Sequence, residues 1–105
     1  MRTPVYSTKF KKDYKRCIKR GFSMQKIIDV MESLENEIPL PPQFKEHPLQ
    51  GEYVNCLECH VEPDWLLIYG YEMLDDDESQ LLLVRTGSHS DLFEVNAPHS
   101  PSIME

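Results

Sequence analysis

The sequence predicts a single α+β domain, in which a short strand and a helical hairpin pack on a mainly antiparallel sheet of about four strands. Apolar residues recur at helical spacing in the first third of the chain, and alternating or continuous apolar runs follow. The chain has 105 residues, 40% hydrophobic and 28% charged, which suits one folded domain. We expect this domain over residues 1–95 and a loose, proline-containing tail over residues 96–105.

The first third of the chain carries the signals of a strand and two helices. Residues 4–7 indicate a short opening strand, and Ser7 or Thr8 can cap the helix that follows. Gly21 suits the end of this helix because glycine tolerates positive φ, and Ser23 can cap a second helix. The expected apolar faces consist of Phe10, Tyr14, Cys17 and Ile18 in the first helix and Met24, Ile27, Ile28, Met31 and Leu34 in the second.

The sheet is expected after a rigid, proline-rich connector at residues 38–42. Residues 52–61 alternate, and the continuous apolar run at residues 65–69 predicts a central strand covered on both faces. A charged hairpin loop at residues 75–79 leads to a last strand at residues 81–86. In the alternating strand we expect one face to carry Leu57, Cys59 and Val61 and the other to carry Glu58, His60 and Glu62.

Positive charge is concentrated at one end of an acidic chain whose net charge is −7. Residues 1–21 carry eight Lys or Arg and one acid, whereas residues 51–105 carry one basic residue and twelve acids. The first helix can therefore act locally on an anionic partner, although a solvated helix face is the simpler reading. The residues expected to contact such an anionic partner are Lys11, Lys12, Lys15 and Arg16.

The compartment expected from the sequence is the cytoplasm. No apolar run approaches the ~20 residues of a membrane helix, and the N-terminus lacks the apolar core of a signal peptide. The odd number of cysteines (Cys17, Cys56 and Cys59) argues against a secreted disulfide scaffold.

Three of the four histidines, His47, His60 and His89, occupy positions from which they could converge at one face or end of the sheet. Cutting RNA without a metal requires a base for the 2′-hydroxyl, an acid for the leaving 5′-oxygen and a donor to the phosphate. Histidine suits the first two tasks because its pKa lies near neutrality. Asp64 can hold an imidazole in the useful tautomer, and Arg85 can bind the phosphate.

Two aromatic residues, Trp65 and Phe93, are candidates for stacking on splayed bases of single-stranded RNA. Each candidate also has a structural alternative: Trp65 opens an apolar strand and suits a core, and His60 suits an ordinary strand surface. Their joint occurrence with Arg85 in a short chain favours the site.

A competing motif is Cys56–His60, which matches Cys-x-x-Cys-His, the attachment signature of c-type haem. Alternation in a strand would place Cys56 and Cys59 on opposite faces, which disfavours haem attachment. A zinc site that adds His47 or His89 to this cluster is a weaker alternative because a second closely spaced ligand pair is missing. We expect no metal and no other cofactor.

Three segments of the sequence resemble the YafQ family of RelE-type bacterial toxins. They are His-Pro-Leu-Gln-Gly at residues 47–51, His-Val-Glu-Pro-Asp-Trp-Leu-Leu-Ile-Tyr at residues 60–69 and Arg-Thr-Gly-Ser-His-Ser-Asp-Leu-Phe at residues 85–93. Their order and separations also match the family, and the resemblance extends over residues 4–94.

The resemblance implies a RelE-like fold and a metal-independent endoribonuclease that cleaves mRNA on the translating 70S ribosome. It also implies inhibition by a cognate antitoxin protein. The matching catalytic positions are His47, His60, Asp64 and His89, and the aromatic positions are Trp65 and Phe93.

The chain departs from the family pattern at Asn55 and Leu57, where the family often has Gly and Arg. Arg85 is thereby left as the only basic residue in residues 51–105. A non-catalytic toxin of the RelE/ParE fold that acts by binding a protein is therefore kept as an alternative.

Overall fold

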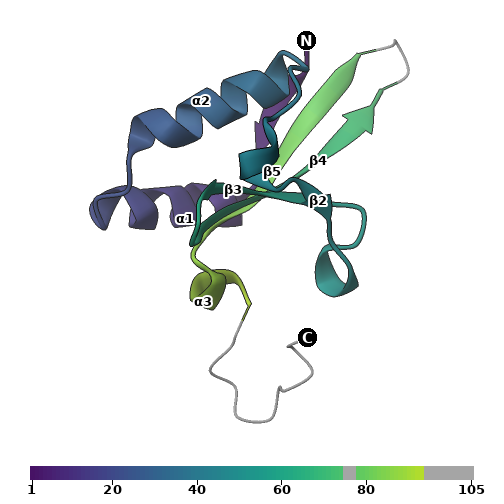
Figure 1. Ribbon diagram of the computed structural model, residues 1–105. Helices are drawn as coiled ribbons and strands as arrows, with labels where there is room; N and C mark the ends of the chain where they lie inside the picture. Colours follow the sequence, from purple (N-terminus) through teal and green to yellow (C-terminus); the bar gives the residue numbers. More distant parts are fainter. Residues whose placement is uncertain (75–77, 94–105) are drawn as a thin grey trace.

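The computed structural model describes residues 1–74 and 78–93, built around a five-stranded sheet of order β1-β5-β4-β3-β2. Helices α1 and α2 lie side by side against one face of this sheet (Figure 1). The expected loop at residues 75–79 lies partly, and the expected tail at residues 96–105 wholly, outside the described residues. The elements are β1 (Thr3–Tyr6), α1 (Thr8–Lys19), α2 (Met24–Glu35), η1 (Pro42–Phe44), β2 (His47–Pro48), η2 (Gly51–Tyr53), β3 (Leu57–Glu62), β4 (Trp65–Met73), β5 (Ser79–Gly87) and α3 (His89–Leu92).

The helical hairpin begins and turns at the residues that the sequence indicates. The Ser7 hydroxyl accepts a hydrogen bond from the backbone N–H of Phe10 at 2.9 Å, and Ser23 caps α2 in the same way. Gly21 lies between the helices with φ of +92°, a conformation that favours glycine. Neither helix, nor any other in the described part of the chain, is long and apolar enough to cross a membrane.

The α+β class is confirmed, with one strand more than expected. β1 pairs in parallel with β5, and every other pair is antiparallel. The additional strand is β2, a two-residue edge strand that pairs His47 with Glu58; Pro48 suits such an edge because it has no N–H to donate. The strand expected from residue 52 begins only at Leu57, because η2 and the positive φ of Asn55 (76°) bend the chain before it.

Alternation along β4 separates two apolar layers. Trp65, Leu67 and Tyr69 pack in the core beneath α1 and α2, whereas Leu66 and Ile68 face the opposite side, where α3 packs. The expected faces of β3 are confirmed for Cys59 and Val61, which join the first layer, and for His60, which pairs with Leu66 in the register of the second. The expected face of Glu62 is wrong, because a bulge after His60 pairs Glu62 with Trp65, and its carboxylate binds Lys26 of α2. The fold thus places Glu58 and His60 on the side away from the helical hairpin.

Candidate active site

The structure brings His47, His60 and His89 into one row. The ring centroids of His47 and His60 lie 6.3 Å apart, and those of His60 and His89 lie 5.9 Å apart. The rings come from three elements: β2, its neighbour β3, and the first residue of α3. Pairing of Leu66 with Gly87 holds the end of β5, and therefore α3, beside the turn between β3 and β4.

At one end of the row, His89 is oriented by Asp64. Asp64 Oδ1 lies 2.6 Å from Nδ1 of the ring and accepts a hydrogen bond from the His89 backbone N–H at 3.1 Å. The hydrogen bond with the His89 side chain lowers the pKa of Asp64, and the backbone N–H acts in the same direction. Because Nδ1 is engaged, Nε2 is the His89 atom left for proton transfer.

At the other end, His47 faces an oxygen atom at each ring nitrogen. Its Nε2 lies 3.0 Å from Glu58 Oε1, and its Nδ1 lies 2.7 Å from the carbonyl oxygen of Lys45. A neutral ring could donate to only one of these acceptors. Both ring nitrogens of His47 are engaged within the protein.

Glu58 is a site residue that the sequence reasoning did not select. Its side chain is 6% exposed, and Oε2 is buried with no hydrogen-bond partner among the described residues. The available signal was its position two residues before His60 on the same strand face. Its burial, however, depends on pairing with β2, which the sequence did not predict.

The central ring, His60, is half-buried and hydrogen-bonds through one of its two nitrogens. Its Nδ1 lies 3.2 Å from the carbonyl oxygen of Pro63, so Nδ1 carries the hydrogen and Nε2 is an acceptor in the neutral ring. Lys45 and His60 both line a groove of about 370 Å³. The central histidine therefore combines a basic nitrogen with open space beside it.

The guanidinium of Arg85 is bound by a buried aspartate of α1. Arg85 Nε donates to Asp13 Oδ2 at 2.7 Å and a terminal nitrogen donates to Oδ1 at 2.8 Å, which raises the pKa of Arg85. Asp13 also accepts from the Thr86 N–H, at the part of the β5 edge that β1 no longer covers. Asp13 was not singled out in the sequence, although it shares the helical face of Phe10 and Cys17.

The two aromatic candidates occupy different environments. The expected contact of Trp65 with a base is wrong for this structure, because its ring is 1% exposed and packs on Phe22 in the core. Its indole N–H donates to the Thr86 hydroxyl at 2.9 Å, so the structural alternative is the one realised. Phe93 is half-buried and lies edge-on to Tyr53, with the ring centroids 6.3 Å apart.

The cysteines of the haem-like motif belong to opposite sides of the sheet. Cys59 is buried in the layer beneath the helices, and burial raises its pKa to about 12. Cys56 packs in the other layer. Within residues 1–74 and 78–93, no group of three His, Cys, Asp or Glu side chains is placed to hold a metal ion.

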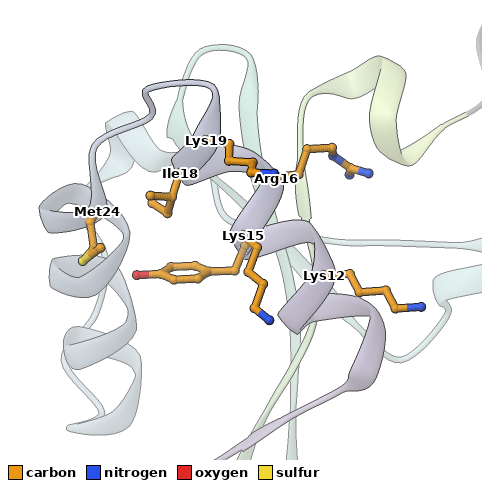
Figure 2. Close-up of a pocket in the computed structure, with 7 residues that line it drawn as sticks. Lys12, Lys15, Arg16, Ile18, Lys19 and Met24 are labelled. Atoms are coloured by element: carbon orange, nitrogen blue, oxygen red, sulfur yellow. The ribbon is translucent and has the colours of Figure 1, made fainter.

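Basic side chains of α1 line a groove beside the start of α2, and one of them, Arg16, also lies 4.0 Å from Asp91 of α3. The groove has a volume of about 590 Å³, and Figure 2 shows Ile18 and Met24 between the helices and the basic residues along α1. Arg16 differs from its neighbours because it donates to Asp13 at 2.9 Å. The residues expected to bind RNA thus include three exposed lysines, namely Lys11, Lys12 and Lys15, and one arginine paired within the protein.

The fold and the sequence pattern together define a class of bacterial toxin. A family model described as "Bacterial toxin of type II toxin-antitoxin system, YafQ" matches residues 2–94, and the chain belongs to this YafQ family.

Relatives and solved structures agree with this assignment. The "mRNA interferase toxin YafQ" of Escherichia coli K12 is 42% identical over 89 residues, which cover 84% of this chain and 91% of that protein. The toxin in the E. coli DinJ-YafQ toxin-antitoxin complex is 43% identical, with a TM-score of 0.74 over 88% of this chain and 97% of that one. A metal-bound toxin from Helicobacter pylori is also 43% identical, with a TM-score of 0.77 over 89% of this chain and 100% of that one.

Proposed function

We propose that this protein is the toxin of a type II toxin-antitoxin pair and cuts mRNA on the 70S ribosome by metal-independent histidine and aspartate catalysis. The observation that carries the proposal is the row of three imidazoles, one of them fixed by Asp64. The name of the E. coli K12 relative, an mRNA interferase toxin, supports the same reaction class.

The two proton transfers are assigned to His60 and His89. His60 Nε2 removes the proton of the 2′-hydroxyl, and the 2′-oxygen then attacks the adjacent phosphorus. The bond from phosphorus to the 5′-oxygen breaks, and His89 donates the proton from Nε2 to that oxygen. The products are a 2′,3′-cyclic phosphate and a 5′-hydroxyl, so atoms and charge balance without a metal.

Other residues of the site act on charge and position. Asp64 keeps the proton of His89 on Nδ1 and stabilises the imidazolium form. His47, paired with Glu58 and next to His60, is assigned to the phosphate side of the site. Arg85, held by Asp13, is the proposed donor to the phosphate, and Phe93 supplies an aromatic face for a base.

Helix α1 is assigned to electrostatic contact with ribosomal RNA. The sheet half is acidic, so the exposed cations of Lys11, Lys12 and Lys15 must provide most of the attraction to phosphate. Arg16 contributes less in this proposal because Asp13 already binds it. Action on the translating ribosome places the protein in the cytoplasm.

A cognate antitoxin is the proposed regulatory partner. The histidine row is exposed, so growth requires that the row be covered or that an element completing it be displaced. The E. coli structure in which DinJ and YafQ form a complex supports such a partner.

Induced expression in a bacterium, followed by primer extension on mRNA, tests the proposal. Wild-type protein should arrest growth and leave discrete mRNA ends. Co-expression of the adjacent small gene should restore growth, and its product should co-purify with the toxin. A variant with His47, His60 and His89 all replaced by alanine should neither arrest growth nor cleave mRNA. If that variant still arrests growth, the non-catalytic toxin becomes the better description.

A further inference from the structure

We propose that Arg20 at the end of α1 is a positioning residue for the general acid, because its ion pair with Asp91 fixes the start of α3 where His89 stands. This inference rests on the proposed function for its consequence in catalysis. The contact of Arg20 with Asp91 at the start of α3 is independent of that function.

The pair that orients His89 needs support from the backbone. The side chains of His89 and Asp64 are 51% and 71% exposed, and exposed charged pairs are only weakly held by their own attraction. One of the two hydrogen bonds to Asp64 comes from the His89 backbone N–H. The geometry of the acid therefore depends on where the first turn of α3 is held.

Asp91 holds that turn from within. Its Oδ2 accepts from the Ser88 backbone N–H at 3.0 Å, while the Ser88 hydroxyl accepts from the Asp91 N–H, which completes a capping box. Gly87 permits the close approach, because a Cβ at this position would lie 2.9 Å from the Cβ of Asp91. The Asp91 carboxylate is thus packed against the last residue of β5.

Arg20 connects the Asp91 carboxylate to the end of α1, on the other side of the sheet from the histidines. Its two terminal nitrogens lie 2.8 and 3.3 Å from the two oxygens of Asp91, a two-point contact that fixes direction as well as distance. Arg16 approaches the same carboxylate at 4.0 Å. Burial opposes ionisation of Asp91, but hydrogen bonds from Arg20 and Ser88 outweigh it and lower the pKa of Asp91 to about 2.

The variant Arg20→Gln removes the two-point contact with Asp91. It tests whether Arg20 positions His89 or only attracts RNA. In the free protein it should accelerate hydrogen exchange at the His89 amide and raise the pKa of Asp64. On saturating ribosome-bound mRNA it should lower single-turnover cleavage by up to about 10²-fold, the loss expected when a reacting group moves by 1 Å. Lys19→Gln removes the neighbouring charge of α1 and should leave both the exchange and the Asp64 titration unchanged.

Arg20→Lys keeps the positive charge but cannot make the two-point contact with Asp91. Its hydrogen exchange at His89, its Asp64 pKa and its cleavage rate should lie between those of Arg20→Gln and wild type. If Arg20→Gln does not fold, Asp91→Asn replaces it, because the amide oxygen can still accept from Ser88. Wild-type exchange and titration in the folded variant would overturn the proposal, and so would altered exchange with an unchanged cleavage rate. A wild-type protein that cuts no mRNA would refute the proposed function, while the exchange and titration would still decide whether Arg20 positions His89.

Discussion

The Nδ1 atom of His89 lies 2.6 Å from Oδ1 of Asp64, a residue 25 positions earlier in the chain. Asp64 comes from the turn between β3 and β4, and His89 opens the short helix after β5. The contact therefore joins the two segments that antiparallel pairing of β4 with β5 brings to one end of the sheet. It also fixes the hydrogen of His89 on Nδ1, which leaves Nε2 for proton transfer.

Replacement of His89 by alanine should remove the general acid. Such groups contribute ~10²–10⁴-fold in rate, so single-turnover cleavage of ribosome-bound mRNA should fall by about that range. Ribosome binding should stay near the wild-type value, because α1 supplies the attraction. Cleavage at the wild-type rate would show that another group donates the proton.

Asp64 and His89 should behave as a unit. The losses in rate from Asp64→Ala and His89→Ala should be much smaller in combination than the product of the two separate losses. The matched comparison is Asp64→Ala with His60→Ala, because these two side chains do not share this contact. Their combined loss in rate should be closer to the product of the two separate losses. Multiplicative losses for the Asp64 and His89 pair would mean that the contact does not serve catalysis.

The acid titration of Asp64 should depend on His89. Because the folded pKa of Asp64 is lowered, the contact stabilises the folded state above the ordinary aspartate pKa of about 3.9. This stabilisation should be lost only as the pH falls through the lower, folded value. Carboxyl ¹³C titration should show the Asp64 pKa returning to its ordinary range in His89→Ala. An identical Asp64 pKa in both proteins would contradict the assignment.

Cleavage should survive chelation by EDTA, since the proposed mechanism uses only imidazole and carboxylate groups. The comparison is informative because a similar toxin from H. pylori is described as metal-bound. Primer extension with purified protein and ribosomes, with and without EDTA, is the measurement; the ribosomes must be returned to their usual magnesium concentration before the assay. Loss of cutting that only zinc restores would refute the metal-independent mechanism.

Removal of the exposed charges of α1 should weaken ribosome binding in a salt-dependent manner. Each phosphate contact of a single strand contributes about −0.7 to the slope of log K against log salt. The combined change of Lys11, Lys12 and Lys15 to glutamine should flatten that slope by up to about 2 units. The control is Lys26→Gln on α2, whose ammonium already pairs with Glu62. An unchanged slope would make the face of α1 a solvated surface only.

Loss of the buried carboxylate in Asp13→Ala should destabilise the fold. Arg85 would keep its charge at a largely buried position without a partner, at a cost of about 3–5 kcal/mol in the free energy of unfolding. Asp29→Ala, on the exposed side of α2, should change it by less than about 0.5 kcal/mol. Denaturant unfolding of both variants checks the difference, and equal stabilities would show that Asp13 has no such role.

The sequence by itself determined the order of β1, α1, α2, β3, β4 and β5, both helix caps, and the faces of β4 and of most of β3. These features depend on short-range rules: Ser7 and Ser23 bond to N–H groups three residues later, and alternation in β3 separates Cys59 from His60. The family resemblance, carried by the segments around His60 and His89, also lay within the sequence.

Only the tertiary structure decided the partners of the site residues. Asp13 meets Arg85 across 72 positions and Arg20 meets Asp91 across 71, and no local pattern encodes such pairings. The same holds for Glu58, which is buried because β2 pairs beside it, and for Trp65, which turned out to be core. Local preferences fix which face a side chain takes, but contact between distant segments depends on how strands and helices pack, and that packing fixes which groups meet.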